Sequence, residues 1–331
     1  MKRIFLLLTL TLLGCGSPKE KEAIDEDTVA TAEEFLSSDG YVMVAVDSLK
    51  TAIDAEAQRQ VQTLGSDPRK YNAYLTQLSP NDPASIPYAI LCLKKYPAPT
   101  GSPVYDTLYR QFANLYFQTA GHLTDTLNSK EYTGLLDKLY DHAEDPDLRN
   151  FLNYLDLFSL KVFITEGTYY ADADPDLFYS IFRVKASPPL LDYLEIRKKE
   201  LKEGFSEDAG LVISFPEVYE RVESWGKFMA DYPDHSLRND ALNLYEMYLS
   251  TLITGMDNSR VFDFEKERLD PEIKSLYENI MKAGKDSLSR KIITDYYILL
   301  SKNDFKYNES VNTFLDKYQL STMLAVEPPT R

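Results

Sequence analysis

The sequence predicts an all-α protein built from antiparallel helical hairpins. Apolar residues recur at spacings of three and four through most of the chain, which is the period of a helix with one buried face. Most of these segments end at proline or glycine, the residues that most often stop a helix. Alternating apolar and polar residues, the pattern of a strand, are scarce.

The first fourteen residues predict a lipoprotein signal peptide. Two basic residues precede the apolar run Ile4–Leu13, which is too short to span a bilayer because a spanning helix takes about 20 residues. The run ends in Leu12-Leu13-Gly14-Cys15, which resembles the bacterial lipobox. We therefore expect Cys15 to be the acylated first residue of the mature protein, and its acyl chains to anchor the protein in the membrane. The alternative is an ordinary signal peptide followed by an unrelated cysteine.

Residues 15–28 are polar and charged and contain no aromatic residue, so they predict a disordered tether between the lipid and the domain. This arrangement predicts a location in the cell envelope. Gly16 provides no acidic mark for retention at the inner membrane, so the outer membrane is favoured if the bacterium has one. The leaflet is left open.

Residues 29–165 predict an N-terminal helical region. The expected helices are Gly40–Leu64, Pro68–Ser79, Pro83–Tyr96, Pro103–Leu127, Ser129–His142 and Pro146–Thr165. The second cysteine, Cys92, lies on an apolar helix face, and the lipidation of Cys15 leaves it no partner for a disulfide. We expect a buried small hydrophobic residue there; a catalytic thiol is the alternative.

Residues 166–320 predict a C-terminal helical region, and residues 321–331 a frayed tail. The joint is placed at Glu166–Pro189, which is rich in Asp, Pro, Gly and Tyr. Residues 208–213 are expected to be a short extended segment. Besides the hairpin described next, the expected helices are Pro188–Glu203, Pro271–Ala283, Ser287–Ser301 and Ser310–Tyr318.

A helical hairpin over residues 214–255 organises the C-terminal region. Ser214 and Glu217 have the spacing of a capping box, which predicts a helix start. The apolar stripe of this helix is Val218, Val222, Trp225, Met229 and Tyr232. Tyr232-Pro233 stops the helix, and a second stripe follows at Leu237, Ala241, Leu244, Tyr248 and Leu252. It ends at Gly255, a helix breaker.

Three segments of the C-terminal region carry a resemblance: EGTYYADADPDLF from Glu166, DAGLVISFPEVYERVESWGKFMADYP from Asp208, and TLITGMDNSRVFDF from Thr251. They resemble a group of bacterial lipoproteins of unassigned activity. The resemblance implies a helical extracytoplasmic domain and carries over no catalytic residues. More loosely, YPDHSLRNDALNLY is similar to hairpins of tetratricopeptide-like lipoproteins, which implies a helical-hairpin array although the strict tetratricopeptide signature is absent.

Charge and motifs disfavour several function classes. The 36 basic and 52 acidic residues give a net charge of −16, which repels nucleic acid. The chain has no P-loop, G-x-G-x-x-G or G-x-S-x-G motif, so we expect no nucleotide cofactor and no serine hydrolase. We expect no metal site. The three histidines form no zinc-binding pair, and the acids of residues 172–176 lack the glycine and the glutamate of a calcium loop.

One set of residues remains a candidate ligand site: Glu166, Tyr169 and Tyr170 at the joint, with Asp257 and Asn258 after the hairpin. Carboxylates, amides and exposed rings on loops at helix ends commonly hold sugars or peptides. The alternative is local, since Asp257 and Asn258 are also typical turn residues.

These observations lead to two functional hypotheses. The first is a lipid-anchored, non-enzymatic module that binds an envelope protein or a peptide. The second is a lipoprotein that binds or processes glycan or peptidoglycan through the acidic and aromatic site near Glu166 and Asp257. The sequence names neither the partner nor the ligand.

Overall fold

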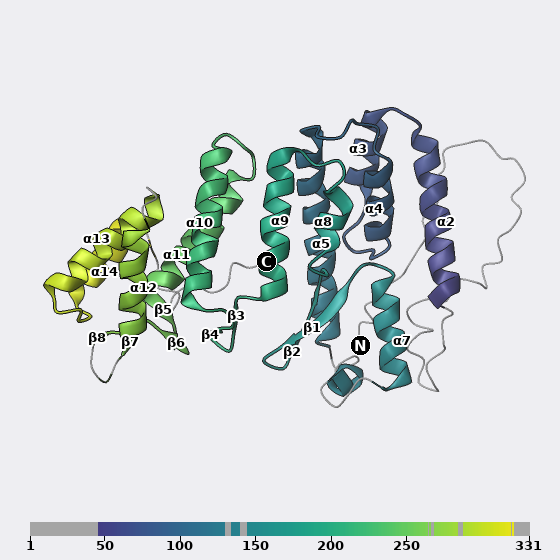
Figure 1. Ribbon diagram of the computed structural model, residues 1–331. Helices are drawn as coiled ribbons and strands as arrows, with labels where there is room; N and C mark the ends of the chain where they lie inside the picture. The colour runs from purple at the N-terminus through teal and green to yellow at the C-terminus, as the bar shows by residue number, and fades with distance from the viewer. Residues whose placement is uncertain are drawn as a thin grey trace, which may run out of the picture. The chain divides into compact units, whose positions relative to one another are not determined.

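The computed structural model describes residues 46–129, 134–139, 144–263, 265, 268–283, 287–318 and 320. The predicted signal peptide, Cys15, the tether and the C-terminal tail lie outside these residues. Within the described part of the chain the protein is mainly helical, with only short antiparallel strand pairs (Figure 1), so the predicted all-α class is confirmed.

Contacts divide the chain into two compact units, which are described separately. The first comprises residues 1–98 and 107–177, and the second comprises residues 99–106 and 178–331. The sequence placed the change of region at residue 166, whereas the contacts assign the segment up to Leu177 to the first unit.

The described elements of the first unit are mostly helices. They are α2 (Val46–Leu64), α3 (Pro68–Gln77), α4 (Ser85–Lys95), most of α5 (Val104–Leu127), the short 3-10 helix η2 (Asp137–Leu139), α7 (Pro146–Asp156), β1 (Lys161–Thr165) and β2 (Thr168–Asp172). Asp67 and Asp145 cap α3 and α7, and a proline follows each cap. These are local signals, so the starts of both helices match the sequence prediction.

The prediction of one helix over Pro146–Thr165 is wrong at its C-terminal end. Helix α7 ends at Asp156, and residues from Lys161 onward form a strand of the antiparallel hairpin β1–β2. The cause is a two-residue turn in which Glu166 has φ 50° and Gly167 has φ 76°. Two positive φ angles twist the chain into the turn that tight strand hairpins use, and the flanking β-branched and aromatic residues favour strands.

The second unit contains the remaining elements. Its helices are α8 (Leu177–Phe182, whose first residue belongs to the first unit), α9 (Pro188–Glu203), α10 (Phe215–Asp231), α11 (Arg238–Thr254), α12 (Pro271–Lys282), α13 (Leu288–Lys302) and α14 (Glu309–Tyr318). Its strands pair as β3 (Ser206–Glu207) with β4 (Gly210–Leu211), β5 (Gly255–Met256) with β6 (Ser259–Arg260), and β7 (Phe262–Asp263) with β8 (Arg268–Leu269). In Figure 1 these three hairpins lie at the lower ends of the helices of this unit.

The predicted hairpin is confirmed as α10 and α11. The capping box between Ser214 and Glu217 is present, and α11 ends at Gly255. A Cβ on Gly226 would lie 3.5 Å from the Tyr245 ring, and Arg221 contacts Tyr248. Residue numbers therefore rise along one helix while they fall along the other, so the two helices are antiparallel.

The buried face of the hairpin differs from the predicted stripes. Met229, Tyr232 and Leu244 are only half-buried, whereas Phe228 and Tyr245 are buried. The reason is a third helix. The rings of Trp225 and Phe228 lie 5.3 and 5.9 Å from the ring of Tyr193 on α9, so α10 buries one face against α9 as well as one against α11.

The sequence analysis expected one short extended segment in the C-terminal region, whereas the described residues of the second unit form the strand pairs β3–β4, β5–β6 and β7–β8. Residues 208–213, expected to be extended, form the turn and second strand of β3–β4 and the chain that follows it.

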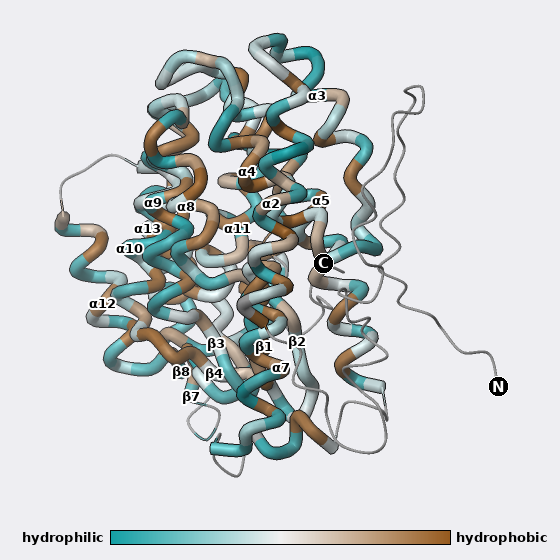
Figure 2. The backbone as a smooth tube through the Cα atoms, turned by 90° about the vertical axis from the view of Figure 1, so that its right-hand side faces the viewer, coloured by the Kyte–Doolittle hydropathy of each residue, from teal (hydrophilic) through white to brown (hydrophobic). Residues whose placement is uncertain are grey.

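Figure 2 shows hydrophobic and hydrophilic residues alternating along the helices. Among the described helices, none is both long and apolar enough to cross a membrane.

Candidate functional site

A pocket of about 510 Å³ opens in the second unit where α11 ends. Most of its wall is apolar and includes Ile253, Val261, Phe262, Val311 and Leu315. These residues come from α11, from the chain around β7, and from α14. The volume falls within the range of about 300–1,000 Å³ that is typical of small-molecule sites.

Gly255 sets the geometry of one side of this pocket. It ends α11 with φ 72°, a conformation that glycine adopts without strain. A Cβ at this position would lie 2.6 Å from the Ser259 carbonyl oxygen and 2.9 Å from the Val261 backbone nitrogen. The chain therefore turns directly from the helix into β5–β6, which brings Met256, Asp257 and Arg260 to the pocket.

Tyr296 lines the pocket, but its hydroxyl is buried. Its side chain is 0% exposed, and its hydroxyl has no hydrogen-bond partner among the described residues. Burial raises the pKa of this hydroxyl, and Tyr307 raises it further. The group is therefore a neutral donor at physiological pH. Tyr307 also lines the pocket, but it is 45% exposed and donates to Asn312 Oδ1 at 2.7 Å.

Asp257 and Asn258, two of the sequence candidates, have different roles in the structure. Asp257 is exposed and lines the pocket, where its carbonyl oxygen accepts a hydrogen bond from Arg260 Nε at 2.9 Å. Asn258 holds the neighbouring hairpin β3–β4. Its side-chain amide donates to the Asp208 carbonyl, and its backbone nitrogen donates to the Ala209 carbonyl at 3.0 Å. Asn258 therefore has a structural role, but it binds a distant segment of the chain, which differs from the local turn that was the alternative.

The other sequence candidates belong to the first unit, whereas Asp257 and Asn258 belong to the second. Tyr169 is buried, and its hydroxyl donates to Asp137 Oδ1 at 2.6 Å. Its backbone exchanges hydrogen bonds with the side chain of Asn128, which directly follows α5. The expectation that Tyr169 is an exposed ligand-binding ring is therefore wrong, because alternation along β2 turns it inward.

Tyr170 and Glu166 remain accessible. Tyr170 is 37% exposed and pairs across the hairpin with Phe163, which is 43% exposed. Glu166 is exposed in the turn of the same hairpin. The outer face of β1–β2 therefore presents two large aromatic side chains, and the turn of the same hairpin presents a carboxylate.

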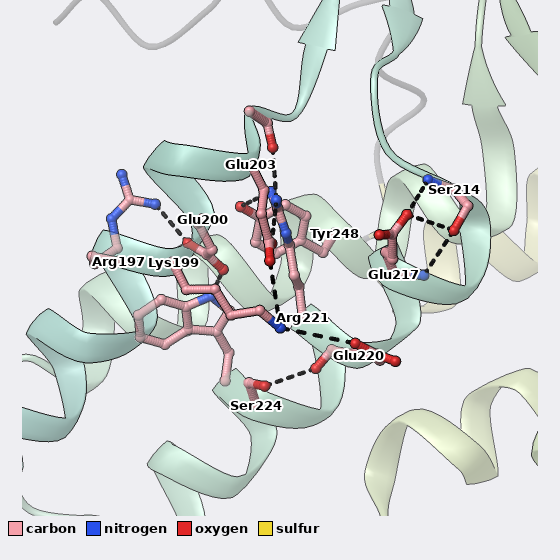
Figure 3. Close-up of polar contacts among 12 residues, drawn as sticks. Arg197, Lys199, Glu200, Glu203, Ser214, Glu217, Glu220, Arg221, Ser224 and Tyr248 are labelled. Atoms are coloured by element: carbon pink, nitrogen blue, oxygen red, sulfur yellow. Dashed lines mark hydrogen bonds and ion pairs between the residues drawn. The ribbon is translucent and has the colours of Figure 1, made fainter. Parts of the chain in front are cut away.

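A buried polar cluster joins α9, α10 and α11 (Figure 3). Glu200 accepts hydrogen bonds from Trp225 Nε1 at 2.6 Å and from Arg197 Nη1 at 2.8 Å. Arg221 donates to the Gly204 carbonyl at 2.6 Å and to Tyr248 Oη at 3.3 Å. Burial raises the pKa of Glu200, although both arginines act in the opposite direction.

This cluster has the properties of a structural network. Glu200 and Arg221 are each 4% exposed, so no ligand of ordinary size reaches them. Opposite charges and hydrogen bonds offset the cost of burying them. A sequence signal for Arg221 exists, because it lies three residues after Val218 and four before Trp225, within the apolar stripe of α10.

Asp106, Ser187 and His235 also meet within the second unit, but in an order unsuited to nucleophilic catalysis. Ser187 donates to Asp106 Oδ1 at 2.6 Å, and His235 Nε2 lies 3.0 Å from Asp106 Oδ2. The carboxylate thus lies between the other two, whereas a serine nucleophile requires the imidazole in that position. Ser187 instead caps α9, and the Leu237 amide donates to His235 Nδ1.

The described residues contain no evident site for metal binding or thiol chemistry. In that part of the chain no three His, Cys, Asp or Glu residues gather as metal ligands; His142 lies outside it. Asp172 and Asp174 instead accept hydrogen bonds from backbone amides of their own loop. Cys92 is fully buried, and burial raises the pKa of its thiol to about 12.

Comparisons with known proteins add no assignment, since no family model, curated protein or solved structure matches this chain. The assignment of the pocket as a candidate site therefore rests on its geometry alone. Sequence reasoning located the loop at Asp257 but missed Tyr296, because one tyrosine among 24 carries no signal that its hydroxyl is left without a partner.

Proposed function

We propose that this protein is a lipid-anchored helical module of the bacterial cell envelope that binds an envelope protein or a peptide and catalyses no reaction. The anchor is supported by the lipobox-like sequence that ends at Cys15. The helical-hairpin fold is consistent with the proposed membership of the lipoprotein group that the C-terminal region resembles.

The observation that carries the binding proposal is the aromatic pair on β1–β2. Phe163 and Tyr170 are cross-strand partners and are 43% and 37% exposed. Aromatic residues are enriched at protein interfaces because they bury much area at low cost in conformational entropy. A solvent-facing pair of this size on a short hairpin is therefore a reasonable contact surface for a partner.

The arrangement of the remaining polar groups supports a non-enzymatic role. Ser187 caps a helix, Glu200 is held by Trp225 and Arg197, and Cys92 is buried with a raised thiol pKa. A buried thiol with a high pKa is a poor nucleophile. In each case the group has a structural role that accounts for its surroundings.

Site-specific photo-crosslinking in the intact envelope tests the binding proposal. A photoreactive residue at Tyr170 is expected to give one discrete adduct that disappears when Phe163 is replaced by serine. The matched control is the same residue at Lys70, an exposed position on α3 of the same unit. Equal labelling at both positions, or an adduct that survives Phe163→Ser, would contradict a specific surface on β1–β2.

The second candidate function is glycan binding, which the accessible Tyr170 on the same hairpin as the exposed Glu166 favours. An exposed ring can stack on a sugar while a carboxylate accepts hydrogen bonds from its hydroxyls. Calorimetric titration with peptidoglycan fragments tests it. Saturable micromolar binding that Tyr170→Ala abolishes would support this function, and the absence of saturable heat would exclude it for those fragments.

A further inference from the structure

The hairpin β1–β2 has two outer edges, and its register shows which backbone groups lie along them. Thr165 faces Thr168 across the two-residue turn, and the residues that flank such a turn exchange hydrogen bonds. Bonded and non-bonded pairs then alternate along the strands, and the N–H and C=O groups of the non-bonded pairs point outward. These pairs are Val162 with Ala171 and Ile164 with Tyr169.

The outer edge of β2 is closed by side chains at the end of α5. The Asn128 side chain accepts a hydrogen bond from the Tyr169 amide at 3.0 Å and donates one to the Tyr169 carbonyl at 2.7 Å. Thr124 Oγ1 accepts from the Ala171 amide at 3.0 Å. These bonds satisfy backbone groups that a neighbouring strand would otherwise bind.

The outer edge of β1 is open. Among the described residues, no group forms a hydrogen bond with the outward backbone atoms of Val162 or Ile164. Both side chains are only half-buried, whereas Tyr169 and Ala171 opposite them are buried. An open strand edge is a template on which a further extended segment can pair, and native proteins normally cover it.

One part of the chain outside the described residues joins the structure close to this edge. It is residues 41–45, which directly precede α2. Helix α2 contacts α7, whose end leads into β1 (Figure 1). Lys50 lines a cavity with Asp156 and Ser159, and Val46 lies one helical turn before Lys50, about 6 Å along the axis. A chain extended backward from Val46 therefore starts near the beginning of β1 and can run antiparallel to it.

The sequence of residues 41–45 suits such a strand. It is Tyr-Val-Met-Val-Ala, which is rich in aromatic and β-branched residues and contains no proline. The sequence analysis included these residues in a helix from Gly40, but the described α2 begins at Val46. Five extended residues span about 17 Å, and β1 also has five residues.

The alternation of the segment fixes its register against β1. Its two valines match the two residues of β1 that have open backbone groups: Val42 lies opposite Ile164, and Val44 lies opposite Val162. Opposite residues share a face of the sheet, so both valines cover the half-buried inner face. Met43 then lies beside the exposed Phe163 on the outer face. A shift by one residue would turn the valines outward.

We propose that residues 41–45 add a third strand to the hairpin, antiparallel to β1 and along its open edge. The valines of the segment exchange backbone hydrogen bonds with Val162 and Ile164. The pairing closes this edge to other chains and places Met43 beside Phe163, which enlarges the surface proposed for the partner. It does not depend on partner binding, so the two proposals are tested separately.

Disulfide formation in the mature chain, residues 15–331 with Cys15→Ser, tests the register. Met43→Cys with Phe163→Cys places two thiols opposite each other in a non-bonded pair, where Cα atoms are about 4.5 Å apart, within disulfide reach. The control is Val42→Cys with Phe163→Cys, which moves one thiol to the other face. A glutathione buffer keeps the exchange reversible, so chance collisions are not trapped.

We expect an internal disulfide between positions 43 and 163, favoured over the control pair by about 10-fold or more, which corresponds to about 1.4 kcal/mol. Peptide mapping of the non-reduced chain identifies the link. Cys92 is buried and should be recovered as a free thiol.

Amide hydrogen exchange, resolved to single residues, provides a second readout without added cysteines. The amides of Val162 and Ile164 should exchange slowly in the Cys15→Ser chain. Val44→Pro removes a donor that faces β1 and should speed both by about 10-fold or more. The matched control is Met43→Pro, which removes an N–H that faces away from β1 and should change them little.

Four results would overturn the proposal. Equal linking of both cysteine pairs removes the register. Disulfide-linked dimers in place of the internal link put a second copy of the chain at the edge. Fast exchange of Val162 and Ile164 in the Cys15→Ser chain leaves the edge open to a segment of another protein. Slow exchange that Val44→Pro does not change assigns the cover to a different part of the chain.

Discussion

Replacing Trp225, the single tryptophan of the chain, with alanine removes the side chain around which α9 and α10 pack. Trp225 is 0% exposed, and its ring lies 5.3 Å from that of Tyr193 and 5.9 Å from that of Phe228. Truncating a buried aromatic residue of this size costs about 3–5 kcal/mol. Because a domain is typically stable by about 5–15 kcal/mol, we expect the second unit to be strongly destabilised.

The hydrogen bond of Trp225 can be separated from its packing. Trp225→Phe keeps an aromatic ring but leaves Glu200 Oε1 without the indole donor that lies 2.6 Å away. A hydrogen bond to a charged group contributes about 1.5–3 kcal/mol, against about 0.5–1.5 kcal/mol for a neutral pair. Trp225→Phe should therefore cost about 1 kcal/mol more in the wild type than in a Glu200→Gln background.

Urea denaturation of the chain from residue 29 onward, followed by circular dichroism, measures these losses. Amide hydrogen exchange of peptides from α9, α10 and α11 then shows whether the loss is confined to the second unit. A loss below about 1 kcal/mol for Trp225→Ala would contradict burial at the helix seam. Equal costs of Trp225→Phe in both backgrounds would contradict a charge-assisted bond to Glu200.

Three further predictions concern single residues. Burial holds the pKa of Glu200 above its ordinary 4.5, so just above pH 4.5 the folded state retains a proton that the unfolded state loses. The free energy of unfolding should therefore fall as the pH rises above 4.5. Urea denaturation at several pH values measures this fall, and Glu200→Gln should remove it. Gly255→Ala should cost more than about 1 kcal/mol, and more than Gly65→Ala, because both glycines have positive φ but only Gly255 has backbone atoms where a Cβ would lie; thermal unfolding compares the two variants. Cys92, with a thiol pKa of about 12, should resist alkylation at neutral pH in the folded chain and react after denaturation; rapid labelling without denaturant would contradict its burial.

Helix boundaries were predictable where the signal is local. The capping box at Ser214 and Glu217 and the glycine at 255 fix the ends of α10 and α11 through groups within a few residues. The hairpin β1–β2 was missed because the run at residues 161–165 is short and mainly apolar. A run of this length fits either a helix or a strand. The two positive φ angles at its turn reverse the chain tightly and so allow the two strands to pair.

Contacts between distant segments could not be predicted in the same way. The sequence showed Trp225 to be on a buried stripe, but not that it faces Glu200 and Tyr193 on α9. The candidate site shows the same limit. Asp257 was identified from its loop, whereas Tyr169 was misassigned and Tyr296 was missed, because their roles depend on Asp137 and on the pocket respectively.

Mass spectrometry of the N-terminal peptide tests most directly whether this protein is a lipid-anchored module. The protein is extracted from membranes with detergent and digested, and the N-terminal peptide is fragmented to locate any added mass. We predict a peptide that begins at Cys15 and carries a diacylglyceryl group on the thiol, with a further acyl chain on the amine in many bacteria. A peptide that retains Met1, or one that begins at Cys15 with a free thiol, would contradict the anchor.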